Sequence, residues 1–214
     1  MRSLLFGILI IILVGFGGLV YRNVVERPSR PIACPMDAMV CPDGTSVART
    51  GLSCTFSPCP PPNVSLADVG ISFAVPTGFA VAEIPDAESV VAYEMATTSS
   101  AEVASIVVRQ YAIAASSTAL ATIRQTAIGG ASGEPMSTTS FTSTVLGTHR
   151  FTVVSLERFE GVVNTAYYLA RGTDVLRFDA IDRGVTNWTD STLSVSTLPA
   201  HKALIELLAT LQGR

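Results

Sequence analysis

The longest hydrophobic run lies near the N-terminus, where residues 4–20 read LLFGILIIILVGFGGLV without a charged side chain. At ~1.5 Å per helical residue, this run approaches the ~20 residues that cross ~30 Å of hydrocarbon. Tyr21 adds an aromatic residue of the kind enriched at membrane interfaces, and Arg22 can extend toward the headgroups. We therefore predict a transmembrane anchor at residues 4–21, preceded by a short cytoplasmic tail at residues 1–3.

Two other interpretations of the N-terminus stay open. A cleaved signal peptide would have its positive region at Arg2, although residues 21–25 contain no A-x-A-like cleavage site. A lipoprotein signal is suggested by Pro31-Ile32-Ala33-Cys34, but a proline stands where leucine is usual. Three arginines also separate the hydrophobic run from that cysteine, which is unusual for such a signal. We prefer the anchor for these reasons.

Hydrophobic and polar residues begin to alternate after residue 64, as is typical of half-buried strands. Val, Ile, Thr and Tyr are frequent in these segments, and Gly and Pro separate them. In one segment, the alternation places Phe151, Val153, Ser155, Glu157 and Phe159 on one face. We predict strands at about 69–76, 79–84, 89–96, 103–112, 137–145, 149–159, 162–170 and 174–181.

Two segments have helical periodicity instead. In residues 119–128, Leu120 and Ile123 share a face, Thr118 or its serine neighbours can cap the start, and two glycines end the helix. Residues 199–211 carry leucines along one stripe, and the proline fits the first turn. Strands outnumber helices and tight turns join neighbouring strands. We therefore predict an α+β fold with a mainly antiparallel sheet covered by helices, one N-terminal transmembrane helix and a small disulfide-stapled segment.

All four cysteines lie between residues 34 and 59, in the spacing C-x6-C-x12-C-x4-C. A zinc site would favour C-x2-C pairs, and the two histidines lie far away in the sequence. An even number of clustered cysteines in a segment too small for its own core indicates two disulfides. Three pairings exist, and the sequence does not choose among them. We favour Cys34–Cys54 with Cys41–Cys59, because crossed loops would staple the segment into one knot.

Prolines separate this cysteine module, residues 34–59, from its neighbours. Residues 22–33 form an extended linker and residues 60–65 a proline-rich one, so the α+β domain is predicted at 66–214. Charges on the two sides of the anchor are nearly balanced and do not decide its orientation. Disulfides persist outside the cytosol. We therefore predict a single-pass protein of a bacterial cell membrane, with a cytoplasmic N-terminus and the bulk of the chain extracytoplasmic.

Composition excludes several classes of function. Only 14% of residues are charged, against ~25% in ordinary domains, and the net charge is −3. A nucleic-acid partner would require clustered Lys and Arg, which do not occur after the anchor. The sequence also lacks the nucleophile-elbow, zinc-protease, P-loop and dinucleotide motifs. We predict no catalytic residue, no cofactor and no metal.

Isolated polar residues offer weaker signals. We interpret His149 and His201 as exposed polar residues, since neither has a partner carboxylate close in sequence. The aspartates at 174, 179, 182 and 190 are spaced too widely for a calcium loop, and we interpret them as solvated turn residues. Trp188 lies in a polar loop, where an exposed indole could contact a partner or fold back onto the core.

Part of the cysteine module contains a recognisable short motif. Residues 40–45, VCPDGT, followed by Cys54, resemble the middle of Kazal-type protease-inhibitor domains. Those domains carry more cysteines and a tyrosine in this stretch, where this chain has Ser46 to Arg49. The resemblance implies an inhibitory loop with Arg49 as its exposed basic residue. A structural spacer stapled by disulfides is the interpretation that we favour.

The main domain resembles a second group. Residues 70–79 read GISFAVPTGF, and this segment looks like the opening of PsbP/Mog1-like domains, in which an aromatic-bearing strand runs into Pro-x-Gly and another aromatic. The middle helix, the strand meander and the last helix follow in the matching order over residues 66–213. Members of that group are non-catalytic assembly factors, binding subunits and anchored proteins without shared catalytic residues. The resemblance therefore implies a scaffold that binds a partner or ligand.

From these features we expect a membrane-anchored, extracytoplasmic, non-catalytic binding or accessory protein, with the membrane as one partner through residues 4–21 and a protein or small molecule as the other. One alternative is an extracytoplasmic hydrolase whose site is assembled from loops. A pocket that brings either histidine close to a serine and a carboxylate would favour it. The other alternative is inhibition of a protease through the cysteine module.

Overall fold

A computed structural model describes residues 2–25, 34–41, 46–51, 53–57, 59, 63–95, 102–129 and 133–213 of the 214-residue chain. The chain divides into two compact units. The first comprises residues 1–38 with 48–57, and the second comprises residues 39–47 with 58–214.

The first unit begins with helix α1 (Arg2–Val25), which includes the hydrophobic run. Gly7 and residues 11–22 of this helix are exposed. Within the described ranges, no helix is both long and apolar enough to cross a membrane. The predicted transmembrane anchor at residues 4–21, and the transmembrane helix of the predicted fold class, are therefore wrong.

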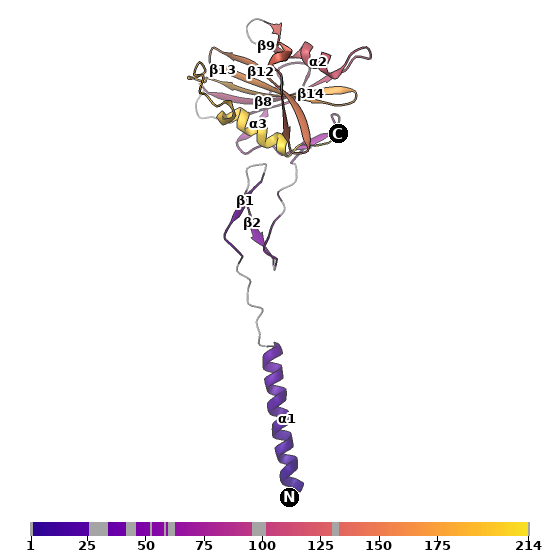
Figure 1. Ribbon diagram of the computed structural model, residues 1–214, viewed down its shortest axis with the longest axis vertical. Helices are drawn as coiled ribbons and strands as arrows, with labels where there is room; N and C mark the ends of the chain where they lie inside the picture. The colour runs from indigo at the N-terminus through magenta and orange to yellow at the C-terminus, as the bar shows by residue number, and fades with distance from the viewer. Residues whose placement is uncertain are drawn as a thin grey trace. The chain divides into compact units, whose positions relative to one another are not determined.

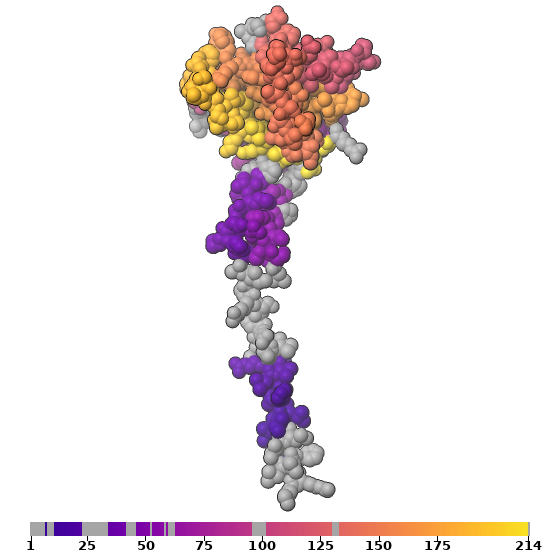
Figure 2. Space-filling model, in the orientation of Figure 1, coloured from indigo at the N-terminus to yellow at the C-terminus, as the bar shows by residue number. Residues whose placement is uncertain are grey.

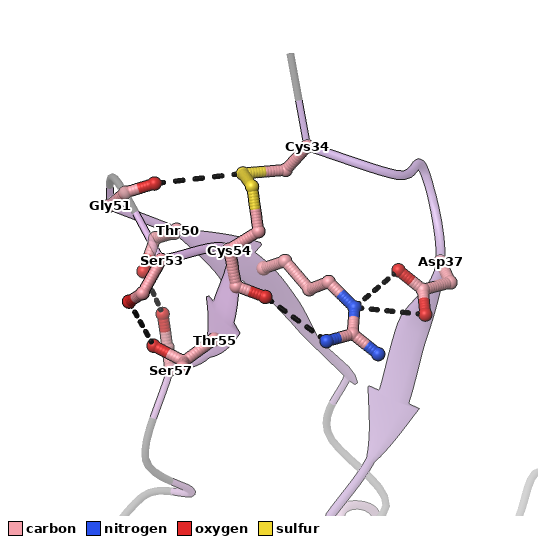
Figure 3. Close-up of a disulfide and its surroundings, with 9 residues drawn as sticks. Cys34, Asp37, Thr50, Gly51, Ser53, Cys54, Thr55 and Ser57 are labelled. Carbon is pink, nitrogen blue, oxygen red and sulfur yellow. Dashed lines mark hydrogen bonds and ion pairs between the residues drawn. A yellow bond between two sulfur atoms is a disulfide. The ribbon is translucent and has the colours of Figure 1, made fainter. Parts of the chain in front are cut away.

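Both disulfides have the pairing that we favoured from the sequence. Cys34 is bonded to Cys54 in the first unit, with Cα atoms 5.3 Å apart, and Figure 3 shows the sulfur of Cys34 near the carbonyl of Gly51. Cys41 is bonded to Cys59 in the second unit, with Cα atoms 5.6 Å apart. The short strands of this region form a three-stranded sheet in the order β1 (Ala38–Val40), β2 (Ser46–Thr50) and β3 (Thr55–Phe56).

A seven-stranded antiparallel sheet forms the centre of the second unit (Figure 1). Its strands, in spatial order, are β11 (Thr142–Leu146), β12 (His149–Phe159), β13 (Val162–Ala170), β14 (Asp174–Arg183), β8 (Val103–Ala112), β7 (Ser89–Met95) and β6 (Phe79–Ala82). A smaller sheet has the order β15 (Gln212–Gly213), β5 (Ile71–Phe73) and β4 (Val64–Leu66), and β9 (Ile128–Gly129) pairs with β10 (Glu134–Pro135). The start of the strand predicted at 137–145 is instead the 3-10 turn η1 (Thr138–Ser140).

Helices cover opposite faces of the large sheet, because alternate residues of each strand point to opposite sides. On β14, Leu176 and Phe178 pack with the leucine stripe of α3 (Pro199–Ala209). Val175 points to the other face and packs with Ile123 of α2 (Ala119–Thr126). We call these the α3 face and the α2 face. The surface of this unit seen in Figure 2 comes mostly from the second half of the chain, coloured crimson to yellow.

A β-bulge interrupts β12 and changes which residues of the strand share a face. Ser155 pairs with Thr165, but Glu157 pairs with Asn164, so one extra residue lies on β12. Residues directly opposite each other share a face, and an extra residue shifts the alternation by one. Ser155 therefore stays on the α3 face with Thr165, whereas Glu157 and Phe159 move to the α2 face. The sequence pattern did not predict this change.

Candidate functional site

A buried aspartate–histidine pair lies where α3 begins. His201 Nδ1 is 2.6 Å from Asp182 Oδ2, and the second carboxylate oxygen accepts a hydrogen bond of 2.8 Å from the backbone N–H of Ala200. Asp182 is 3% exposed and His201 1%. Both side chains are thus held inside the second unit.

The local sequence explains why these two residues meet. Asp182 is an even-numbered residue near the end of β14 and points to the α3 face, like Phe178. The residue before α3 is Leu198, which has no side-chain oxygen to cap the helix. Asp182 accepts from a first-turn amide instead, and a carboxylate is stabilised there by the helix dipole. His201, two residues into α3, then lies beside that carboxylate.

The imidazole also lines a cavity of about 300 Å³ on the α3 face. Most of its lining residues carry hydroxyl groups: Ser140, Thr142, Ser155, Thr165, Tyr167 and Ser196. Val153 and Val195 complete the lining with His201. The cavity thus lies over β12 and β13, between the start of β11, the 3-10 turn η2 (Val195–Thr197) and α3.

The second nitrogen of this histidine has no hydrogen-bond partner among the residues that the structure describes. His201 Nε2 is inaccessible to solvent and unpaired there, although its ring borders the cavity. A buried polar atom without a partner is costly. The expectation that His201 is an exposed surface residue is therefore wrong. Distance in sequence hid its partner, because Asp182 lies 19 residues earlier.

His149 lies elsewhere, at the first residue of β12, and is half-buried. Its Nε2 is 3.1 Å from the carbonyl oxygen of Gly213, and its Nδ1 is 3.3 Å from the hydroxyl of Thr148. No carboxylate is paired with it among the described residues, so the structure gives His149 no part in the His201 site.

The other aspartates of the loose sequence cluster are separated by the fold. Asp174 is 7% exposed and binds Arg171 and Gln110, and Asp179 is fully buried between Arg109 and Arg177. Asp190 is exposed and accepts from the backbone and hydroxyl of Thr192. The interpretation as solvated turn residues is thus wrong for three of the four, including Asp182.

The charged residues on the α2 face form an internal network. Burial alone would lower the pKa of Arg109, but Asp179 and Asp86 outweigh it and raise that pKa. Burial likewise opposes the charge of Arg177, and Asp179 reverses the effect and raises its pKa. Arg177 also donates to the carbonyl of Thr126 at 2.7 Å, at the end of α2. These charges are satisfied within the protein, which indicates a structural role.

Trp188 and Arg49, the two predicted partner contacts, both interact with neighbouring residues of the protein. Trp188 is half-buried and packs edge-to-face on Phe159, with ring centroids 5.9 Å apart. Arg158 donates to the Trp188 carbonyl at 2.6 Å. Arg49 binds Asp37 at 2.8 Å, donates to the Cys54 carbonyl at 3.0 Å and lies over the ring of Phe56. Arg49 is therefore part of the module's own packing, which weakens its prediction as an inhibitory residue.

No family model and no curated protein matches this sequence. One solved structure, of a protein from Bacteroides thetaiotaomicron VPI-5482, is similar to 67% of this chain with a TM-score of 0.39 and 15% identity. The match spans 45% of that protein's chain. A likeness at this level carries no argument about function, so the function must be inferred from the His201 site.

Proposed function

We propose that this chain is an extracytoplasmic, non-catalytic binding or accessory protein that takes a small ligand in the cavity beside His201. The observation that carries the proposal is the cavity of about 300 Å³ on the α3 face, which lies beside the buried Asp182–His201 pair. Ligand cavities typically begin at about this size and combine a mostly apolar wall with a few polar groups.

Binding is favoured over catalysis by what surrounds the imidazole. A hydrolytic triad needs a nucleophile within hydrogen-bond distance of the histidine. Among the described residues, no serine or threonine hydroxyl makes such a bond to Nε2. The resemblance of residues 66–213 to PsbP/Mog1-like domains remains a prediction and supports the same function, since members of that group share no catalytic residues.

The extracytoplasmic location is supported by Cys34–Cys54 and Cys41–Cys59. Disulfides persist in oxidising compartments and are rare in the cytosol. Intact cells treated with a membrane-permeant alkylating reagent test this part. All four cysteines should resist modification until a reductant is added. Rapid alkylation without reductant would contradict the location.

Ligand binding is tested by screening the full-length protein against a library of small fragments by ligand-observed NMR. Fragments should bind to the wild type and lose binding when Thr165 is replaced by Trp, which fills the cavity from its floor. Ser143→Trp is the matched control, because Ser143 is exposed on β11 and does not line the cavity. If no fragment binds, or if both variants bind alike, the proposal fails.

A hydrolase is the second candidate, and the Asp182–His201 pair is the observation that favours it. A carboxylate that orients an imidazole recurs in hydrolases that use a serine nucleophile. A fluorophosphonate probe, which reacts with activated serines, tests this function on the full-length protein. Labelling of a cavity serine that disappears in His201→Ala would favour catalysis. Unlabelled wild type would leave binding as the function. The described residues offer no observation in favour of protease inhibition.

A further inference from the structure

We propose that the protein binds a neutral carbohydrate of about one or two rings in a second cavity, which lies between helix α2 and the end of strand β8. This cavity measures about 530 Å³. It shares no lining residue with the cavity beside His201. The inference therefore goes beyond the proposed function, and neither depends on the other.

The wall of the second cavity is polar. Of its ten lining residues, eight carry polar side chains, and only Ala112 and Ala114 do not. Hydroxyl and amide groups predominate among the eight, and both kinds of group donate as well as accept hydrogen bonds. A ligand that satisfies such a wall must itself carry several donors and acceptors, as a sugar does.

Helix α2 supplies one side of the cavity. Thr122, Gln125 and Thr126 line it and share one face of the helix, because they are spaced at i, i+3 and i+4. Gln125 is exposed, and its amide makes no hydrogen bond to the residues that the structure describes. The half-buried Thr126 donates to the Thr122 carbonyl at 2.9 Å and keeps lone pairs that can accept from a ligand.

Tyr111 supplies the opposite side from β8. It lies directly opposite Val175, so its side chain points to the α2 face and is half-buried there. Among the described residues, its hydroxyl has no hydrogen-bond partner and is not one of the buried unpaired atoms, so it is accessible. Burial raises the pKa of Tyr111, so the hydroxyl keeps its proton and can donate. The ring offers a flat apolar face for the C–H groups of a sugar.

The charges around the cavity favour a neutral ligand. The lining residues include no Lys or Arg, and Asp179 binds both Arg109 and Arg177 on the same face of the sheet. An anion would therefore meet no available cation. Glu88 is the one charged lining residue, and it is exposed, so water weakens its attraction for a cation. Burying an unpaired charge costs more than burying a hydroxyl, so a neutral molecule fits best.

The cavity is also open to a ligand from solution. Ser116 is exposed and Ser117 is half-buried, and both lie in the loop between β8 and α2. Their hydroxyls, like the amide of Gln125, make no side-chain hydrogen bond to the described residues. A sugar can therefore reach these groups without any change in the fold.

Saturation-transfer NMR of the full-length protein with D-glucose, maltose and D-glucuronate tests the ligand class. Glucose or maltose should bind, and glucuronate should bind about tenfold more weakly or less, because its carboxylate meets no cation. Gln125→Ala should weaken glucose or maltose binding about fivefold, the effect of losing one hydrogen bond. Arg124→Ala is the matched control, since Arg124 is exposed on the same helix and does not line the cavity.

Three further variants locate the bound sugar. Ser116→Trp places a large side chain at the cavity and should abolish binding. Thr165→Trp fills the cavity beside His201 and should leave sugar binding unchanged. Tyr111→Phe keeps the aromatic ring but removes the hydroxyl, and it should weaken binding about fivefold.

The outcomes separate this inference from the proposed function. If neither sugar binds, if glucuronate binds as tightly as glucose, or if Gln125→Ala and Tyr111→Phe both bind like the wild type, the inference is wrong. Sugar binding that survives Ser116→Trp but disappears in Thr165→Trp would place the sugar beside His201, which overturns the inference and supports the proposed function. Sugar binding that is lost only in Ser116→Trp supports the inference, whether or not fragments bind beside His201.

Discussion

Arg109 and Arg177 lie directly opposite each other on β8 and β14, and the buried carboxylate of Asp179 binds both guanidinium groups. Like charges on opposite residues of neighbouring strands repel each other, so this arrangement depends on the carboxylate between them. Asp86 adds a second partner to Arg109 at 2.8 Å. The network therefore connects β8 and β14 on the α2 face through ion pairs, where aliphatic side chains would otherwise pack.

Replacing Asp179 with Asn should leave two buried cations facing each other. We expect a loss of about 3–5 kcal/mol in the free energy of unfolding, as is typical when one partner of a buried ion pair is removed. Urea denaturation followed by Trp fluorescence measures it. Asp86→Asn is the control, because its side chain is 36% exposed and water can replace it. Equal losses in the two variants would contradict the central role of Asp179.

Acid should weaken the fold in part through Asp174. Burial would raise the pKa of this carboxyl, but hydrogen bonds from Arg171 and Gln110 outweigh it and hold the pKa below 3.8. The unfolded chain therefore binds the proton more readily than the folded chain. The stability from the ionised carboxylate is complete above the unfolded pKa and is lost as pH falls through the folded pKa.

Denaturation of the wild type and of Asp174→Asn at several pH values isolates this contribution, since asparagine does not titrate. The difference in unfolding free energy should be largest near pH 6 and should shrink below pH 4. A difference that stays constant down to pH 2 would show that Asp174 does not contribute to the acid sensitivity.

The two disulfides should differ in their effect on the sheet. Cys41–Cys59 closes a loop of 18 residues within the unit that contains the sheet, whereas Cys34–Cys54 lies within the first unit. Replacing Cys41 and Cys59 with Ser should destabilise the second unit by about 3 kcal/mol, the entropy of a loop of this size. Replacing Cys34 and Cys54 should leave the unfolding midpoint reported by Trp188 unchanged. The reverse order would contradict this division of the chain.

Trp188 is the only tryptophan of the sequence and lies in the loop after β14, so its fluorescence reports on the packing of that loop. Trp188 packs on Phe159, and the Arg158 guanidinium donates to the carbonyls of Trp188 and Asp190. Arg158→Ala should release this loop and move the fluorescence emission to longer wavelength, because the indole gains contact with water. Arg150→Ala is the matched control, since Arg150 is exposed on the same strand and binds Ser143. An unchanged spectrum in Arg158→Ala would show that Phe159 alone holds the indole.

Local patterns in the sequence were enough for much of the secondary structure. The predicted strands at 149–159 and 162–170 have the same bounds in the structure, and the leucine stripe of α3 packs on the sheet. Thr118 accepts from the backbone N–H of Ala121 and caps α2. Alternation, helical periodicity and capping each depend on residues close in sequence. Hydrophobicity alone, however, misled the prediction of a transmembrane anchor at residues 4–21.

Such local patterns could not predict the candidate site. Asp182 and His201 are polar residues on different elements, and neither belongs to a motif, so only the docking of α3 on β14 brings them to 2.6 Å. The bulge keeps Ser155 beside Thr165 and places Glu157 on the opposite face of the sheet. It is set by the register between two strands. The sequence by itself determined the strands, the last helix and the clustered cysteines, because those signals are local. The tertiary structure decided the buried pair, the orphan Nε2 and the cavity, because each depends on contacts between residues distant in sequence.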